Sequence, residues 1–176
     1  MMKIVVVYKS ISGFTTKYAE WIAEELKADL LRLEKIDIDI LLKYDIIIYG
    51  GSLHAAGISG VNIVKNNLNK LRDKNIIIFT TGASLPKEST ISEVRDSNFS
   101  LEEQKQISFY YFRGGFNFNK LNFTNKILMT LLKWKIKLKR DKTPDEKGML
   151  AAYSKPMDFT KRENIKELLE FVRSLM

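Results

Sequence analysis

The chain has 176 residues, 45% of them hydrophobic and 28% charged, with a formal net charge of +8. This length and composition indicate one globular domain, residues 1–176, with a buried core. The absence of cysteine and the single histidine exclude disulfides, thiol catalysis and a multi-histidine metal centre. Met1-Met2-Lys3 leads directly into an apolar run, and no run approaches the ~20 residues that span a bilayer, so we expect a cytoplasmic protein without a signal peptide.

Strands and helices are predicted to alternate along the chain. Continuous runs of β-branched residues such as Ile4–Tyr8 suit parallel strands that are buried on both faces. The five expected strands are Ile4–Tyr8, Asp29–Leu33, Asp45–Tyr49, Asn75–Phe79 and Ile107–Phe112. Helices are expected over Thr15–Lys27, Gly60–Leu71, Ser100–Gln104 and Thr160–Leu175, the last opened by a capping box of Thr160 and Glu163. This alternation predicts an α/β fold with a doubly wound parallel sheet and helices on both faces.

Four of the expected strands end in loops of small residues. These loops are Ser10–Thr16, Gly50–Ala56, Thr80–Ser84 and Arg113–Gly115. In doubly wound sheets, ligands bind at the carboxyl ends of the strands, near the point where the strand order reverses. The four loops are therefore expected to surround a ligand site at one edge of the sheet.

The first loop, Lys9-Ser10-Ile11-Ser12-Gly13-Phe14-Thr15-Thr16, places hydroxyl groups and a glycine where a strand becomes a helix. A helix N-terminus has unpaired N–H donors and a partial positive charge, which suits a phosphate held without a lysine. The loop lacks both the Gly-Lys-Ser/Thr ending of a Walker A motif and the Gly-x-Gly-x-x-Gly fingerprint. The pattern indicates a single phosphate, as on a mononucleotide; the alternative is an ordinary strand-to-helix turn with an N-cap.

This first loop resembles the phosphate loop of the flavodoxins, Thr/Ser-x-Thr/Ser-Gly-x-Thr, and the resemblance covers essentially the whole chain. It implies a five-stranded parallel sheet in the order 2-1-3-4-5 and non-covalent FMN as cofactor. The implied phosphate ligands are Ser10, Ser12, Gly13, Phe14 and Thr15. The flavin ring would be bordered on one side by Ser52, Leu53, His54 and Ala55, and on the other by Thr81, Gly82 and Ala83. Because Leu53 and Ala83 replace the aromatic residues common there, we expect an open ring face.

A closer resemblance begins at Phe112-Arg113-Gly114-Gly115-Phe116 and continues in Pro156-Met157-Asp158-Phe159-Thr160. These runs are similar to a flavodoxin-type subfamily that includes the menaquinone-dependent protoporphyrinogen IX dehydrogenases of heme biosynthesis. Its members carry an insertion rich in aromatic and basic residues, which here would span about 116–155. The resemblance implies an FMN-dependent oxidoreductase that oxidises protoporphyrinogen IX, or a similar planar donor, with a quinone as acceptor.

Two cationic residues are candidates for catalysis. His54 would hydrogen-bond flavin N1, N5 or the substrate, or is an ordinary surface residue. Arg113 would stabilise the reduced flavin or bind a substrate carboxylate bidentately, or would form a structural salt bridge.

Residues 125–142 carry seven Lys/Arg and one Asp, so most of the net charge is local. Ile127, Leu131, Trp134 and Leu138 fall on one helical stripe, with Leu128 and Leu132 beside it. One interpretation is a helix packed on the core with a solvated basic face. Another is an interfacial helix that meets anionic lipid on the inner face of the membrane. Nucleic-acid binding is a third and less favoured interpretation, because no nucleic-acid motif accompanies the charge.

Three functions from different classes follow. The favoured one is a flavin-dependent oxidoreductase at the membrane surface. The second is a flavodoxin-type electron carrier whose basic segment docks acidic redox proteins. The third is a flavin-free binding domain.

Overall fold

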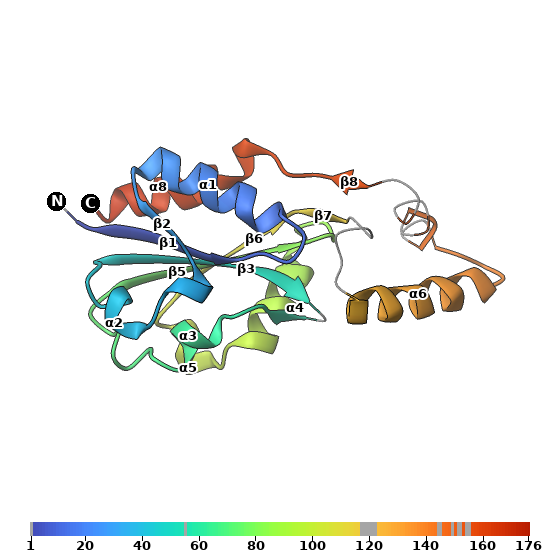
Figure 1. Ribbon diagram of the computed structural model, residues 1–176, viewed down its shortest axis with the longest axis horizontal. Helices are drawn as coiled ribbons and strands as arrows, with labels where there is room; N and C mark the ends of the chain where they lie inside the picture. Colours follow the sequence, from blue (N-terminus) through green and yellow to red (C-terminus); the bar gives the residue numbers. More distant parts are fainter. Residues whose placement is uncertain are drawn as a thin grey trace.

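The structure, a computed structural model, describes residues 2–54, 56–116, 123–143, 146–148, 150, 153 and 156–176. Five parallel strands form the central sheet in the order β2-β1-β3-β5-β6 (Figure 1). Their bounds are β1 (Ile4–Lys9), β2 (Asp29–Arg32), β3 (Ile46–His54), β5 (Asn75–Gly82) and β6 (Ser108–Arg113). A short sixth strand, β4 (Gly57–Ile58), pairs antiparallel with the end of β3. The predicted α/β fold and the order 2-1-3-4-5 of the five main strands are confirmed.

Helices cover both faces of the sheet. In chain order they are α1 (Phe14–Leu26), η1 (Leu33–Lys35), α2 (Ile38–Leu41), α3 (Asn62–Lys65), α4 (Glu88–Asn98), α5 (Leu101–Gln104), α6 (Phe123–Leu138), η3 (Arg162–Ile165) and α8 (Lys166–Ser174). The helix expected at Thr15–Lys27 is confirmed as α1, one residue earlier. The short helix expected at Ser100–Gln104 is also confirmed, with Ser100 as its N-cap in a capping box with Glu103. Helix α4 was not predicted from the sequence.

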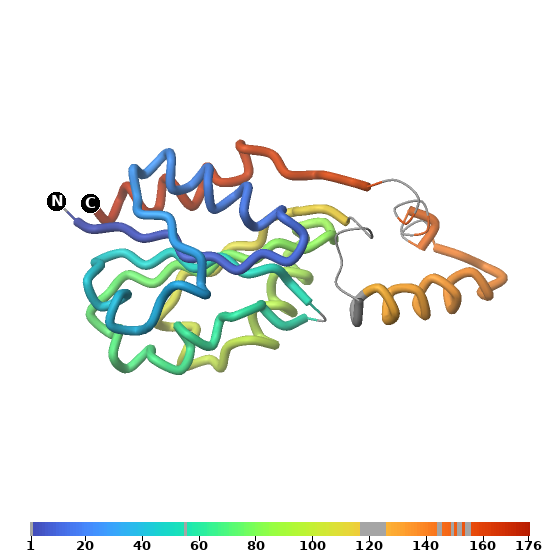
Figure 2. The backbone as a smooth tube through the Cα atoms, viewed as in Figure 1, coloured from blue at the N-terminus to red at the C-terminus, as the bar shows by residue number. Residues whose placement is uncertain are grey.

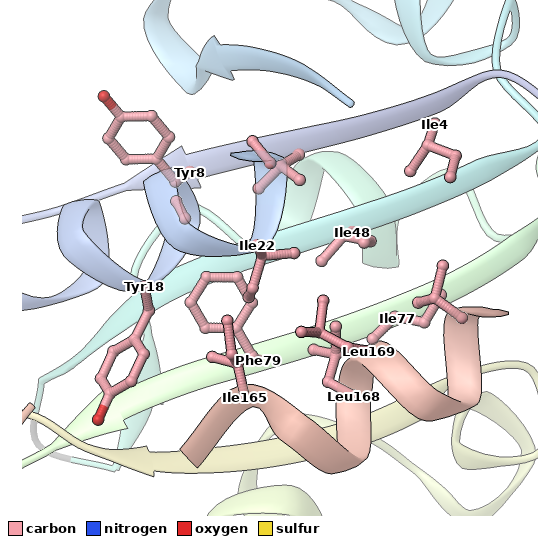
Figure 3. Packing of buried hydrophobic residues seen from close by; sticks show 14 of the residues in the cluster. Ile4, Tyr8, Tyr18, Ile22, Ile48, Ile77, Phe79, Ile165, Leu168 and Leu169 are labelled. Atoms are coloured by element: carbon pink, nitrogen blue, oxygen red, sulfur yellow. The ribbon is translucent and has the colours of Figure 1, made fainter. Parts of the chain in front are cut away.

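Two hydrophobic clusters hold the layers together. Successive side chains of a strand point to opposite faces, so β1 contributes Val6 to one cluster and Val5 to the other. On the first face, strand residues including Ile48 and Phe79 pack against α1 and α8, as Figure 3 shows. On the other face the sheet packs against residues of α3, its following turns and α4. Burial on both faces explains why these strands are continuous apolar runs.

The helix predicted over Gly60–Leu71 is wrong in its length. Only Asn62–Lys65 is α-helical, and the chain continues in turns whose hydrogen bonds include Asn67 N–H to Val64 O at 2.9 Å. The Asn67 side chain donates back to Ile63 O at 2.9 Å. Asparagine amides compete for backbone groups in this way and disfavour a regular helix. The turns nevertheless bury Leu68 and Leu71 against the sheet.

The capping box predicted for the last helix is also wrong. The backbone N–H and hydroxyl of Thr160 both donate to Asp158 Oδ1, at 2.9 and 2.7 Å. In a capping box the Thr160 N–H would donate to the Glu163 carboxylate, so its bond to the Asp158 carboxylate takes the place of the box. The helical segment therefore begins later, as the 3₁₀ turn η3, which continues into α8.

Two short strands flank α6 in the sequence and pair with each other. The strands β7 (Gly115–Phe116) and β8 (Met157–Asp158) pair antiparallel. Between them in sequence, α6 lies beyond the carboxyl ends of the parallel strands, apart from the layered body (Figure 2). Across the residues that the structure describes, no helix has the length and apolarity needed to cross a membrane.

Candidate cofactor site

The turn between β1 and α1 is built around Gly13. Its φ of 93° lies in the left-handed region, which favours glycine, and it is the N-cap of α1. Glycine offers no side chain to cap the helix, and the first turn of α1 contains no acidic residue. The Ser10 hydroxyl accepts from Gly13 N–H at 3.0 Å and so fixes the turn. The first-turn N–H groups of α1 have no partner within the helix, so the turn fits a terminal phosphate.

Beneath this turn, three hydroxyl groups meet in the core. Thr15 Oγ1 lies 2.8 Å from Ser52 Oγ and 2.7 Å from Thr81 Oγ1. Ser52 Oγ also accepts from Ile11 N–H at 3.0 Å. We call Thr15, Ser52 and Thr81 the hydroxyl cluster. Since Ser52 and Thr81 are register partners on β3 and β5, the cluster ties together three loops that the sequence analysis placed at one site.

Replacing Thr15 by valine tests the structural part of this arrangement. Thr15 is fully buried, so valine preserves the shape but leaves the Ser52 and Thr81 hydroxyls without their shared partner. We expect a loss of about 2–4 kcal/mol in the free energy of unfolding, because each buried polar group left unpaired costs about 1–3 kcal/mol. Denaturant unfolding measures it, with Thr16→Val, one residue further on, as the control. A loss below that of the control would contradict the role of the cluster.

The Phe14 side chain is buried. A Cβ atom added to Gly115 would lie 2.7 Å from Phe14 Cζ, so the ring packs closely under the Gly114-Gly115 backbone. Ser12 is half-buried in the turn. Of the predicted phosphate ligands, Phe14 can therefore contribute only its backbone N–H, Gly13 N–H already donates to Ser10 Oγ, and Ser12 can contribute its hydroxyl.

The second predicted loop extends β3. Leu53 pairs with Ile58 and His54 pairs with Gly57 of β4, and the His54 side chain is exposed. Ala55 lies outside the described residues. Within the described part of the chain, no side-chain hydrogen bond or ion pair engages His54, which leaves its imidazole available to a ligand.

Asn98, at the end of α4, anchors this loop from below. Its Oδ1 accepts from Ile58 N–H at 2.9 Å, and its Nδ2 donates to Ala56 O and Val94 O, both at 2.7 Å. Ala56 has a φ of 67°, an uncommon conformation for a residue other than glycine. Asn98 was not predicted as part of the site, because its partners on the loop lie about 40 residues away in the sequence. The only local feature of the sequence that distinguishes Asn98 is that this polar residue directly precedes the apolar Phe99.

The third loop follows β5 and is exposed from Ala83 onward. Arg113 Nε donates to Ala83 O at 3.4 Å, and Tyr111 OH donates to Ser84 O at 3.2 Å. Burial raises the pKa of Tyr111, which keeps this hydroxyl protonated as a donor. Two side chains of β6 thus hold the loop at the edge of the sheet.

Arg113 occupies the rim of the site. Its guanidinium carbon lies 3.7 Å from the centroid of the Phe159 ring, and its carbonyl accepts from Tyr18 OH at 2.7 Å. No carboxylate among the described residues pairs with it, which argues against the salt-bridge interpretation. His54 is the last residue of β3 and Arg113 is the last residue of β6, and β5 lies between these two strands. Their backbones are therefore about 10 Å apart by strand spacing.

Groups of three or more His, Cys, Asp or Glu that could hold a metal ion are absent from the described residues. The described polar groups of the site are hydroxyls, backbone amides and the side chains of His54 and Arg113. Such donors suit an anionic organic cofactor better than a cation.

Comparison with known proteins identifies a family. The sequence profile of the flavodoxin domain matches residues 5–143. An uncharacterised protein of Methanocaldococcus jannaschii is 35% identical over 98 residues, covering 54% of this chain and 65% of that protein.

Solved structures of similar proteins include flavodoxins. A short-chain flavodoxin associated with a bacterial microcompartment has 13% identity and a TM-score of 0.47, covering 64% of this chain and 84% of that one. A WrbA-like flavodoxin from Agrobacterium tumefaciens has 22% identity and a TM-score of 0.45, with the same coverage of 64% and 84%.

Proposed function

Because the chain belongs to the flavodoxin domain family, whose membership implies FMN as cofactor, we propose that it is an FMN-dependent oxidoreductase acting on a planar organic donor. The observation that carries the proposal is the convergence of the first three loops on the hydroxyl cluster, beside a helix N-terminus without acidic residues. FMN, when bound, supplies reversible acceptance of electrons or hydride. The protein supplies binding, orientation and electrostatics.

Different residues of the site would bind the phosphate, border the flavin ring and place charged or hydrogen-bonding groups beside it. The Ser10–Thr15 turn would hold the phosphate through backbone N–H groups and the Ser12 hydroxyl. The β3–β4 turn, anchored by Asn98, and the loop at Gly82-Ala83 would border the ring. His54 and Arg113 would place positive or hydrogen-bonding groups beside it. A cation near the ring stabilises the negative charge that develops on reduction.

The donor we propose is protoporphyrinogen IX or a similar reduced macrocycle, with a quinone as acceptor. Three features support this choice: the subfamily resemblance, the basic segment, and an Arg113 guanidinium without a carboxylate partner among the described residues. Arg113 rests on Phe159, an arrangement that orients its fork, and a guanidinium fork binds a carboxylate such as a propionate bidentately. The separation of Arg113 from His54 suits a donor as wide as a porphyrin ring.

A direct assay tests the activity. FMN-loaded protein is mixed anaerobically with protoporphyrinogen IX and a water-soluble quinone, and porphyrin fluorescence is followed. We expect turnover that requires both quinone and FMN. Arg113→Gln should raise the KM about tenfold or more while FMN remains bound, since one charged hydrogen-bonding partner contributes about 1.5–3 kcal/mol. Arg95→Gln, on α4, is the control and should leave the KM unchanged.

The second candidate is an electron carrier between redox proteins. It is favoured by the net +6 of residues 125–142, which would attract an acidic partner. Electron transfer to such a protein that slows steeply with salt, together with no turnover of protoporphyrinogen, would replace the first proposal by this one.

A further inference from the structure

The helix α6 exposes an apolar stripe. Its exposed large hydrophobic residues number five of the eleven found among the described residues. They are Ile127 (48% exposed), Leu128 (52%), Leu131 (64%), Trp134 (67%) and Leu138 (83%). Four of them follow the spacing of one helical face. The interpretation of this stripe as a core-packed face is therefore wrong, and an exposed contiguous patch of this kind usually marks an interaction site.

The opposite side of α6 already has partners. Ile136 is 4% exposed. Tyr153 OH donates to Met129 O at 2.7 Å, and Lys133 Nζ lies 5.0 Å from the Tyr153 ring centroid. Tyr153 in turn contacts Phe116 of β7, with ring centroids 5.3 Å apart. These contacts fix which side of α6 faces inward, so the stripe points away from the residues that hold the helix.

Positive charge flanks the stripe. Lys135 lies on one side of it, and Lys126 and Lys137 lie on the other, by helical periodicity. No carboxylate among the described residues pairs with these three lysines, whereas Lys139 is paired with Glu146 at 2.6 Å. The sequence of α6 contains no acidic residue. Between the end of α6 and Asp145, the only acidic residue in the sequence is Asp141. An apolar face with cationic borders complements a surface that is apolar within and anionic at its rim.

We propose that α6 docks in the plane of an anionic lipid membrane, with the stripe in the acyl boundary and the lysines at the headgroups. Trp134 suits the headgroup level, where tryptophan is enriched. A nucleic acid would match the lysines but would leave the apolar stripe in water. Since α6 lies beyond the carboxyl ends of the strands, docking would bring the candidate cofactor site close to the membrane surface (Figure 2).

The two tryptophans allow a residue-specific test. Trp21 packs against the core, so Trp21→Phe leaves Trp134 as the single reporter. With vesicles of phosphatidylglycerol and phosphatidylcholine, we expect a blue shift of Trp134 emission and co-sedimentation of the full chain. Vesicles of phosphatidylcholine alone should give a much smaller effect. Equal binding to both kinds of vesicle, or none to either, would overturn the proposal.

Matched variants separate the two parts of the surface. Leu131→Gln with Leu138→Gln should weaken vesicle binding by about 100-fold or more, since each of the two leucines contributes about 1.5–3 kcal/mol when fully buried. Lys135→Gln with Lys137→Gln should weaken it about 25-fold, at ~1 kcal/mol per basic residue. Leu101→Gln, 76% exposed on α5, is the control and should bind like the wild type.

Two outcomes would assign the stripe to another occupant. A dimer that dissociates in the Leu131→Gln, Leu138→Gln variant without lipid would mean that a second copy covers it. Tight RNA binding lost with the lysines, without vesicle binding, would mean a nucleic acid. Docking requires no bound flavin, so FMN content measured in the same samples keeps this test distinct from that of the proposed function.

Discussion

Replacing Ser12 by glutamate is expected to weaken FMN binding on the order of 100-fold and to leave the fold intact. Ser12 is half-buried in the turn before Gly13, and no described contact of the core depends on its side chain. A carboxylate there would stand beside the phosphate. Two like charges ~5 Å apart at an effective dielectric constant of about 20 repel by about 3 kcal/mol. Quenching of FMN fluorescence on binding measures the affinity.

Ser12→Ala is the matched control for this prediction. It removes a single hydroxyl without adding charge, so we expect a smaller loss, of about tenfold. Thermal unfolding without FMN should give similar midpoints for both variants and the wild type. If Ser12→Glu binds FMN within threefold of the wild type, the phosphate does not lie in this turn.

Replacing Asn98 by leucine is expected to lower the free energy of unfolding by about 3–5 kcal/mol. The side chain is 8% exposed and makes three hydrogen bonds, so its loss leaves Ile58 N–H and Ala56 O without their side-chain partner. Each buried group left unpaired costs about 1–3 kcal/mol. The β3–β4 turn should also loosen, so FMN should bind more weakly even under conditions where the variant is folded. Denaturant unfolding and FMN titration measure the two effects.

Asn67→Leu is the control for Asn98→Leu. Asn67 makes one described side-chain hydrogen bond, to Ile63 O, from a half-buried position away from the site. We expect a loss of about 1 kcal/mol and unchanged FMN affinity. Similar losses in the two variants would show that Asn98 has no special role in holding the turn.

Four of the five main strands could be predicted because each is a largely apolar run, of which Ile46–Ile48 is an example, that ends in small residues. That pattern arises only when both faces of a sheet are covered. The helix α4 could not be predicted in the same way. Apart from Ile91 and Val94, the residues of α4 are polar. The packing of these two side chains in the hydrophobic cluster therefore stabilises the helix. Tertiary packing, rather than periodicity, determines such an element.

The site was only partly predictable. The loops after β1, β3 and β5 were identified from their composition, and the structure joins them at Thr15, Ser52 and Thr81. The role of Asn98 depends on where α4 lies, which no local pattern encodes. On α6, periodicity predicted the stripe but not its direction. The contacts of Tyr153 and the burial of Ile136 decide that.

Titration of the purified, flavin-free chain with FMN shows whether the chain binds this cofactor. We expect quenching of FMN fluorescence that saturates at one FMN per chain, a visible spectrum of bound flavin, and a higher unfolding temperature when FMN is present. A folded chain that stays colourless and leaves FMN fluorescence unchanged would contradict FMN binding by this chain. It would favour the flavin-free binding domain instead.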